Sequence, residues 1–253
     1  MGADLAHRGR EFHIEGIDDS DHLMERIAHY GTFYEIDLLT YIESLKDVLP
    51  VGVAVDVGAN IGNHTIFLAE FVRTPLIAFE PNPDVLPLLK SNLAANHVHV
   101  KVIEKGLGAS ESRGQMDVWD QGNRGNARII DGGDIEISTL DEQCRDVQVA
   151  LIKVDVEGME LQVLQGAVET LKRCQPHLFL EAGTKKDLRV LTEFLEPLGY
   201  QALTHWADTP VWHFAPHPSV GFKLRTRGRR ATWWFRFVAA EIRGRRRRSH
   251  QAL

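Results

Sequence analysis

The sequence predicts an α/β fold in which a mostly parallel sheet is covered by helices on both faces. Three observations support this prediction. Short apolar runs alternate with stretches of helical periodicity, the pattern of strands joined by crossover helices. The first apolar run ends in a glycine-rich turn that opens a helix. Hydrophobic residues make up 43% of the 253 residues, enough for one packed core with extensions.

The central elements follow from these runs. We expect strands near residues 53–57, 76–80, 99–104, 149–155 and 177–182. We expect helices near residues 63–72, 83–96, 159–173 and 187–197. In the expected strand order, 3-2-1-4-5, the first and fourth strands are neighbours. The loops that follow these two strands should therefore face each other across the ligand crevice.

Three regions divide the chain. Residues 1–50 form an N-terminal extension and helical cover, in which residues 1–20 should be loosely ordered and residues 21–48 show helical spacing. Residues 51–222 form the main domain, and residues 223–253 form a basic, aromatic tail.

Further strands are expected inside the main domain. Residues 115–120 and 135–140 should be strands on either side of a turn at residues 123–127. Residues 201–206 and 210–215 should form an antiparallel hairpin that completes a seven-stranded sheet.

The charge is unevenly distributed. Residues 223–253 carry eleven Lys/Arg and one acid, a net charge of +10, whereas residues 1–222 carry −16. Aromatic residues with a basic fringe suit an anionic membrane surface or polymer, and the alternative is docking on the acidic body or on a second subunit of a homodimer. Nothing in the chain resembles a nucleic-acid module.

The sequence also indicates in which cellular compartment the protein is expected. No apolar run reaches the roughly 18–20 residues that span a bilayer, and the N-terminus lacks the sections of a signal peptide. Cys144 and Cys174 do not have the spacing of a metal site. We expect a cytoplasmic protein, with peripheral binding to the inner membrane surface as an option that depends on the tail.

The turn after the first expected strand has the spacing G-x-N-x-G, with Gly58, Asn60 and Gly62. A dinucleotide fingerprint needs a middle glycine so that the backbone can approach a pyrophosphate. Asp56 would repel a pyrophosphate and attract a cation, such as the amino group or sulfonium of S-adenosylmethionine. Glu80, eighteen residues after Gly62, suits a ribose diol. The pattern therefore favours S-adenosylmethionine over NAD.

A later segment, residues 151–167, contains K-x-D-x-E-G-x-E-x-x-V-L-x-G-A and resembles the signature of the FkbM family of S-adenosylmethionine-dependent methyltransferases. Other motifs of that family occur in order at Phe33–Glu35, residues 56–62, Phe79–Asn82 and Thr139–Asp141. The resemblance runs from about residue 30 to residue 183. It implies a Rossmann-like class I methyltransferase fold and O-methylation of sugars, polysaccharides or polyketide products.

Several loop residues are expected to bind the donor. Gly58 and Gly62 should bring backbone to its methionine part, and Asn60 should orient the loop or meet the amino-acid end. Thr65 is expected to cap the helix or to bind the donor carboxylate. Glu80 should accept both ribose hydroxyls.

The rest of the expected donor site comes from other segments. Asn82 should assist at the ribose, and the backbone of Gly106 and Leu107 should lie against the adenine. By the resemblance, Tyr34 and Glu35 cover the donor pocket. The expected donor-binding residues at the turn after the fourth strand are Asp155 and Glu157.

The expected catalytic groups are Asp155, Glu181, His205 and His213. Asp155 and Glu181 end neighbouring strands and could share Mg²⁺, which would lower the pKa of an acceptor hydroxyl. A third ligand beside Glu181 is missing from the sequence, so a metal-free site is the alternative. His205 and His213 are candidate general bases, with packing roles as the alternative.

The favoured function is O-methylation of a hydroxyl on a sugar, oligosaccharide or polysaccharide, with a small-molecule or glycan acceptor as partner. A polyketide or other secondary metabolite is the alternative acceptor. A non-catalytic donor-binding component of a glycan-assembly complex is the alternative from another class, and the acids at positions 80 and 155 argue against it.

Overall fold

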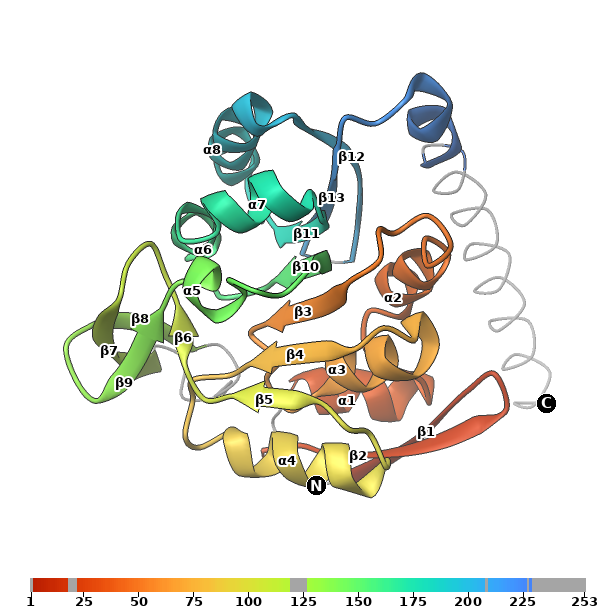
Figure 1. The fold of residues 1–253 in the computed structure, drawn as a ribbon. Coiled ribbons are helices and arrows are strands. Elements are labelled where there is room, and N and C mark those ends of the chain that lie inside the picture. The colour runs from red at the N-terminus through yellow and green to blue at the C-terminus, as the bar shows by residue number, and fades with distance from the viewer. Residues whose placement is uncertain (1, 18–21, 119–126, 208, 227, 229–253) are drawn as a thin grey trace.

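A mixed sheet of seven strands forms the centre of the molecule (Figure 1). The computed structural model describes residues 2–17, 22–118, 127–207, 209–226 and 228. Five parallel strands are β5 (Lys101–Ile103), β4 (Leu76–Phe79), β3 (Val53–Val57), β10 (Val149–Val154) and β11 (His177–Glu181), in that order across the sheet. The expected order of these five strands is confirmed.

Two antiparallel strands extend the sheet beyond β11. β13 (Val211–Pro216) pairs antiparallel with β11, and β12 (Tyr200–Trp206) pairs antiparallel with β13 at the edge. The alternation of strand side chains between the two faces gives the sheet two separate cores. In β3, for example, Val55 and Val57 enter one core and Ala54 enters the other.

Helices cover both faces of this sheet (Figure 1). One face carries α5 (Leu140–Gln143), α6 (Glu160–Gln165), α7 (Val168–Cys174) and α8 (Lys185–Leu195), which continues into η2 (Glu196–Leu198). The other face carries α1 (His22–Tyr30), α2 (Ile36–Glu43), α3 (Asn63–Phe67), the π-helical turn η1 (Leu68–Val72) and α4 (Leu86–Ala95).

The segment expected as one helix over residues 159–173 is two helices, α6 and α7, separated at Gly166. A Cβ at Gly166 would lie 2.0 Å from the carbonyl oxygen of Gly108. The chain thus needs glycine where the end of α6 meets Gly108, which directly follows residues 106–107, and the helix is interrupted there.

The N-terminal residues are more ordered than the sequence predicts. Over residues 2–15 the expectation of loose order is wrong, because β1 (Gly2–His7) and β2 (Arg10–Glu15) pair antiparallel as a hairpin. Alternate positions of the two strands bury Leu5, Phe12 and Ile14 in the core beneath α3 and α4. These three residues and the partly buried Ala3 are too few to give the sequence a clear period.

The expected helical segment over residues 21–48 is interrupted. Gly31 has φ of +62° and follows α1, and Glu35 has φ of +54° and precedes α2. These left-handed positions turn the chain between the two helices.

A small second sheet follows β5, in the order β6 (Gly106–Leu107), β9 (Ile135–Ser138), β7 (Ser112–Val118) and β8 (Ala127–Asp131). Two of these strands, β7 and β9, match expected strands, and β6 and β8 were not predicted. Most of the expected turn at residues 123–127 lies outside the described residues, as does most of the tail. Among the described helices, none is both long enough and apolar enough to cross a membrane.

Candidate active site

A pocket of about 370 Å³ lies at the carboxyl ends of β3, β4, β10 and β11. Its volume is within the range of small-molecule sites. The small sheet contributes Met116 and Ile129 to its lining, and α1 contributes His22, Leu23 and Arg26. The pocket therefore lies at the switch in strand order, where the sequence predicts the ligand crevice.

The loop after β3 makes one wall of this pocket. Gly58 has φ of +78°, and a Cβ there would lie 1.9 Å from the carbonyl oxygen of Asp155. Only glycine allows the loops after β3 and β10 to approach this closely. Asn60 lines the pocket, and its Oδ1 is buried without a hydrogen-bond partner. Gly62, with φ of +95°, precedes α3 and does not line the pocket.

Glu80 follows β4 and is held in place by the backbone of two loops. Its Oε2 accepts a hydrogen bond from the Asn60 amide at 2.8 Å, and its Oε1 accepts one from the Asn82 amide at 2.8 Å. Burial raises the pKa of Glu80 above its ordinary value, although the two amides oppose this. Gly106 and Leu107, the residues expected to lie against the adenine, also line the pocket.

Lys153 is a functional candidate that the sequence analysis missed. Its side chain is 2% exposed, and its Nζ lies 3.3 Å from Oδ1 of Asp56 and 3.2 Å from Oδ2 of Asp155. Burial alone would lower the pKa of Lys153, but these two carboxylates raise it above its ordinary value. A lysine in the middle of the apolar run Leu151–Val154 was the available signal, because a buried cation needs a carboxylate partner.

Asp56 and Thr65, two residues expected at the donor, lie next to Lys153 and support it. Asp56 is fully buried, and its Oδ2 accepts a hydrogen bond from Thr65 Oγ1 at 2.7 Å. Neither residue lines the pocket, and the contacts that the structure shows for Asp56 and Thr65 are with each other and with Lys153. Asp56 lies opposite Lys153 in the β3–β10 strand pair, so its carboxylate interacts with Lys153 and Thr65.

Three acids gather at the ends of β10 and β11. Burial and the charge of Asp155 raise the pKa of Glu181 to about 9, and the two carboxyl groups share a hydrogen bond. For Asp155, burial acts to raise the pKa, but the Lys153 and His64 interactions hold it below its ordinary value. Burial and the charges of Asp155 and Glu160 raise the pKa of Glu157 to about 7. All of these acids except Glu160 line the pocket.

The Asp155–Glu181 pair does not fit a divalent metal. Within the described parts of the chain, no group of three His, Cys, Asp or Glu side chains has metal-binding geometry. The Lys153 ammonium already lies against Asp155, where a cation would be repelled. The expectation of Mg²⁺ on these two residues is therefore not supported, and we derive no step from it.

Tyr34 and Glu35 cover one side of the pocket, next to α3. Asn63 fixes the Tyr34 backbone, since Asn63 Oδ1 accepts from the Tyr34 amide at 3.0 Å and Nδ2 donates to its carbonyl oxygen at 3.2 Å. The Tyr34 ring stacks on His64, whose Nε2 lies 3.4 Å from Glu35 Oε2. Burial and the Lys153 charge lower the pKa of His64 to about 3, so this imidazole is neutral.

The two histidines expected as bases lie away from the pocket. His213 is fully buried, with its Nδ1 2.7 Å from the Tyr41 hydroxyl and its Nε2 2.8 Å from Nδ1 of His177. Burial and His177 lower the pKa of His213 well below its ordinary value. His205 packs its ring on Trp212, at 4.5 Å between centroids. Neither histidine lines the pocket, and the contacts described for both are with neighbouring aromatic and histidine side chains.

The strand order and the position of the pocket define an α/β protein with its site at the carboxyl ends of the central strands. Residues 56–202, more than half of the chain, match the Methyltransferase FkbM domain, and the chain belongs to this family. The resemblance inferred from the motifs is thereby confirmed.

Curated relatives are methyltransferases. The hexuronic acid methyltransferase AglP of Haloferax volcanii is 32% identical over 122 residues, which cover 46% of this chain and 50% of AglP. The match thus spans half the length of that relative. The methyltransferase sdnD of Sordaria araneosa is 28% identical over 189 residues, covering 58% of this chain and 72% of sdnD.

A solved structure has a similar fold. The methyltransferase FkbM from Methylobacillus flagellatus superposes with a TM-score of 0.50 at 23% identity, over 65% of this chain and 43% of that chain. At this identity the likeness supports the fold alone.

Proposed function

We propose that this protein transfers the methyl group of S-adenosylmethionine to a hydroxyl group of a sugar, oligosaccharide or polysaccharide. The observation that carries the proposal is Glu80, a buried carboxylate fixed by the amides of Asn60 and Asn82 at the rim of the glycine loop. A carboxylate has about four lone-pair sites, so two amide bonds leave capacity for the two hydroxyls of a ribose.

Other features of the pocket fit the same donor. The unpartnered Oδ1 of Asn60 offers an acceptor to the donor's amino group. The apolar side chains of Leu107, Val85 and Phe79 suit the adenine. When bound, the donor supplies an electrophilic methyl group already activated by its sulfonium. The protein has to orient the acceptor, exclude water and take up a proton.

Glu157 is the group best suited to take that proton. Its pKa of about 7 makes it a carboxylate at slightly alkaline pH while it remains basic enough to accept a proton. Asp155 is tied to Lys153, and Glu181 carries a proton at neutral pH, so both are poorer bases. We assign orientation of the acceptor hydroxyl to Asp155 and Glu181 through hydrogen bonds.

The proposed acceptor class rests on two arguments. Carboxyl groups such as those of Asp155, Glu157 and Glu181 are natural hydrogen-bond partners of hydroxyls. AglP, whose name gives hexuronic acid as its substrate, is 32% identical over the shared region. A uronic acid also carries a carboxylate, and the basic side chains of Arg26 and Lys105 line the pocket.

A mass-spectrometric screen tests the proposal. The purified protein is incubated with S-adenosylmethionine and a panel of neutral sugars, uronic acids, glycans and phenolic polyketides. We expect a sugar to gain one methyl group while S-adenosylhomocysteine accumulates. Methylation of the polyketides alone would contradict the acceptor class. Calorimetric binding of NAD without binding of S-adenosylhomocysteine would contradict the donor.

A further inference from the structure

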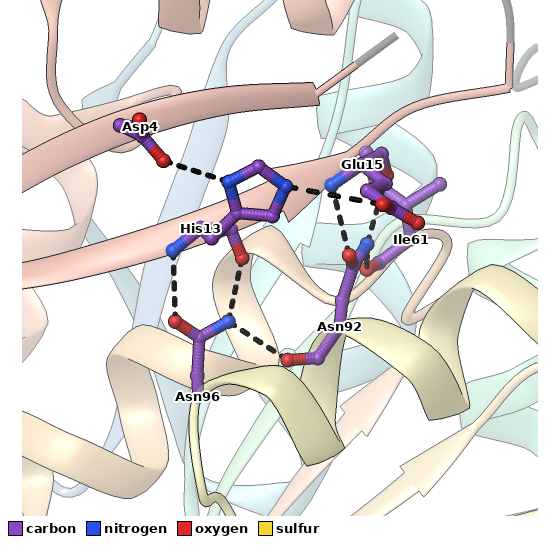
Figure 2. Close-up of polar contacts among 6 residues, drawn as sticks. All are labelled: Asp4, His13, Glu15, Ile61, Asn92 and Asn96. Carbon is purple, nitrogen blue, oxygen red and sulfur yellow. Dashed lines mark hydrogen bonds and ion pairs between the residues drawn. The ribbon is translucent and has the colours of Figure 1, made fainter.

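Asn92 on α4 connects two segments that are far apart in the sequence (Figure 2). Its side chain is fully buried. Its Oδ1 accepts a hydrogen bond from the Glu15 amide, and its Nδ2 donates to the carbonyl oxygens of Glu15 and Ile61, all at 2.8 Å. One side-chain amide therefore bonds strand β2 of the N-terminal hairpin and the glycine loop at the same time.

The bond to Ile61 reaches the wall of the pocket. Ile61 follows Asn60, whose amide donates to Glu80 and whose Oδ1 faces no hydrogen-bond partner. The Ile61 side chain is fully buried in the core that also contains Phe12 and Ile14 of the hairpin. The hairpin, Asn92 and the loop are thus coupled by packing and by hydrogen bonds.

Asn96, the C-cap residue of α4 and four residues after Asn92, provides an internal comparison (Figure 2). Its Oδ1 accepts from the His13 amide at 2.9 Å, and its Nδ2 donates to the His13 carbonyl oxygen at 2.7 Å. Its third bond goes to the carbonyl oxygen of Asn92, at 2.8 Å. Asn96 therefore anchors the same strand with the same chemistry, but it makes no recorded bond to the glycine loop.

We propose that Asn92 is a positioning residue for donor binding, through which the N-terminal hairpin becomes part of the donor site. The hairpin, residues 2–15, precedes the residues 56–202 that match the family domain. The inference rests on the proposed function, which makes residues 58–62 the donor loop. Loss of the Asn92 amide leaves the buried Ile61 carbonyl oxygen without this donor, so the loop loses its fixed position.

The test compares Asn92→Ala with Asn96→Ala in the full chain. Both variants should lower the melting temperature, because both lose bonds to β2. Calorimetry with S-adenosylhomocysteine should show binding weakened about tenfold or more for Asn92→Ala and within about twofold of wild type for Asn96→Ala. Equal effects in the two variants, or unchanged binding in Asn92→Ala, would overturn the proposal.

A second variant guards against a failure to fold. Asn92→Leu keeps the volume of the buried side chain without introducing a charge, and it removes the donors to Ile61 and to the Glu15 carbonyl oxygen. We expect it to weaken binding of S-adenosylhomocysteine as Asn92→Ala does, and wild-type affinity in the folded variant would overturn the proposal.

Hydrogen exchange separates this inference from the proposed function, because it needs no ligand. The amides of Asn60 and Gly62 should exchange faster in the Asn92 variants and at the wild-type rate in Asn96→Ala. If wild-type protein binds no S-adenosylhomocysteine, the proposed function fails while the exchange data still decide the coupling. Wild-type exchange of these amides in every variant would overturn it.

Discussion

Lys153 keeps one acid of the pocket, Asp155, ionised. Its ammonium lies between two carboxylates, Asp56 and Asp155, and nearly the whole side chain is excluded from water. Buried charges are tolerated only when they are paired, and each of the three groups depends on the others. The single cation keeps Asp155 ionised beside Glu181, which holds a proton.

Removal of Lys153 should therefore be costly. Lys153→Met leaves the fully buried Asp56 with only its Thr65 hydrogen bond, and we expect a loss of about 3–5 kcal/mol in the free energy of unfolding. Urea denaturation measures this loss. The double variant Lys153→Met with Asp56→Asn removes both charges and should recover part of it. A loss below about 1 kcal/mol in the single variant would show that the network adds little.

The pKa of Glu157 gives a second prediction at this scale. The carboxylate form of Glu157 becomes populated as the pH rises through about 7, so the rate of methyl transfer should rise across the same range. Glu157→Gln should lower kcat by about 10²- to 10⁴-fold at pH 8 and remove this limb of the pH profile. Wild-type pH dependence in the variant would exclude Glu157 as the proton acceptor. A melting temperature close to that of the wild type serves as the control for folding.

At the scale of elements, the close approach of two loops shapes the site. The loop after β3 and the loop after β10 meet where Gly58 faces the carbonyl oxygen of Asp155. Gly158, in the second loop, has φ of +94° but open space around its Cα. Gly58 thus combines a left-handed conformation with a close steric contact, whereas Gly158 has the left-handed conformation alone.

Alanine substitutions at Gly58 and Gly158 separate the effect of the backbone conformation from that of the steric contact. Gly158→Ala should cost about 1–2 kcal/mol of stability, the usual penalty of a left-handed conformation. Gly58→Ala has the same penalty and also forces the two loops apart, so it should cost more and weaken binding of S-adenosylhomocysteine. Thermal unfolding and calorimetry on both variants measure the difference. Equal stability and equal affinity would refute the steric role of Gly58.

Elements marked by neighbouring residues could be predicted from the sequence, whereas elements that depend on contacts between distant residues could not. The five central strands and the glycine turn follow from contiguous apolar runs and glycines, so they could be placed from the sequence. The hairpin of residues 2–15 could not, because its stability depends on contacts with α4. The buried position of His213, away from the pocket, could not be predicted for a similar reason. Its partner Tyr41 lies 172 residues away, and no local pattern reveals that burial.

At the scale of the whole molecule, an acid buried at the pocket makes the stability of the folded protein depend on pH. Glu181 has a pKa raised to about 9, so the folded state binds this proton more tightly than the unfolded chain does. Its contribution to stability is fully present below the unfolded pKa, near 4.3, and is lost as the pH rises towards 9. Functional sites commonly carry such a cost.

Glu181→Gln should remove this pH dependence. Glutamine resembles the protonated carboxyl group and can still donate a hydrogen bond to Asp155. We expect the melting temperature of the variant to match wild type near pH 5 and to exceed it increasingly towards pH 9. Melting curves across this range make the comparison. A constant difference at every pH would show that Glu181 titrates normally in the folded protein.

The central claim is that the pocket binds the nucleoside of S-adenosylmethionine through Glu80. Calorimetric titration of S-adenosylhomocysteine into wild type, Glu80→Ala and the surface control Glu104→Ala tests it most directly. Glu104 is half-exposed and paired with Lys90. We predict that Glu80→Ala weakens binding by about 1–3 kcal/mol, the value of hydrogen bonds to a charged group, while Glu104→Ala binds as wild type does. Wild-type affinity in a folded Glu80→Ala variant would contradict the account.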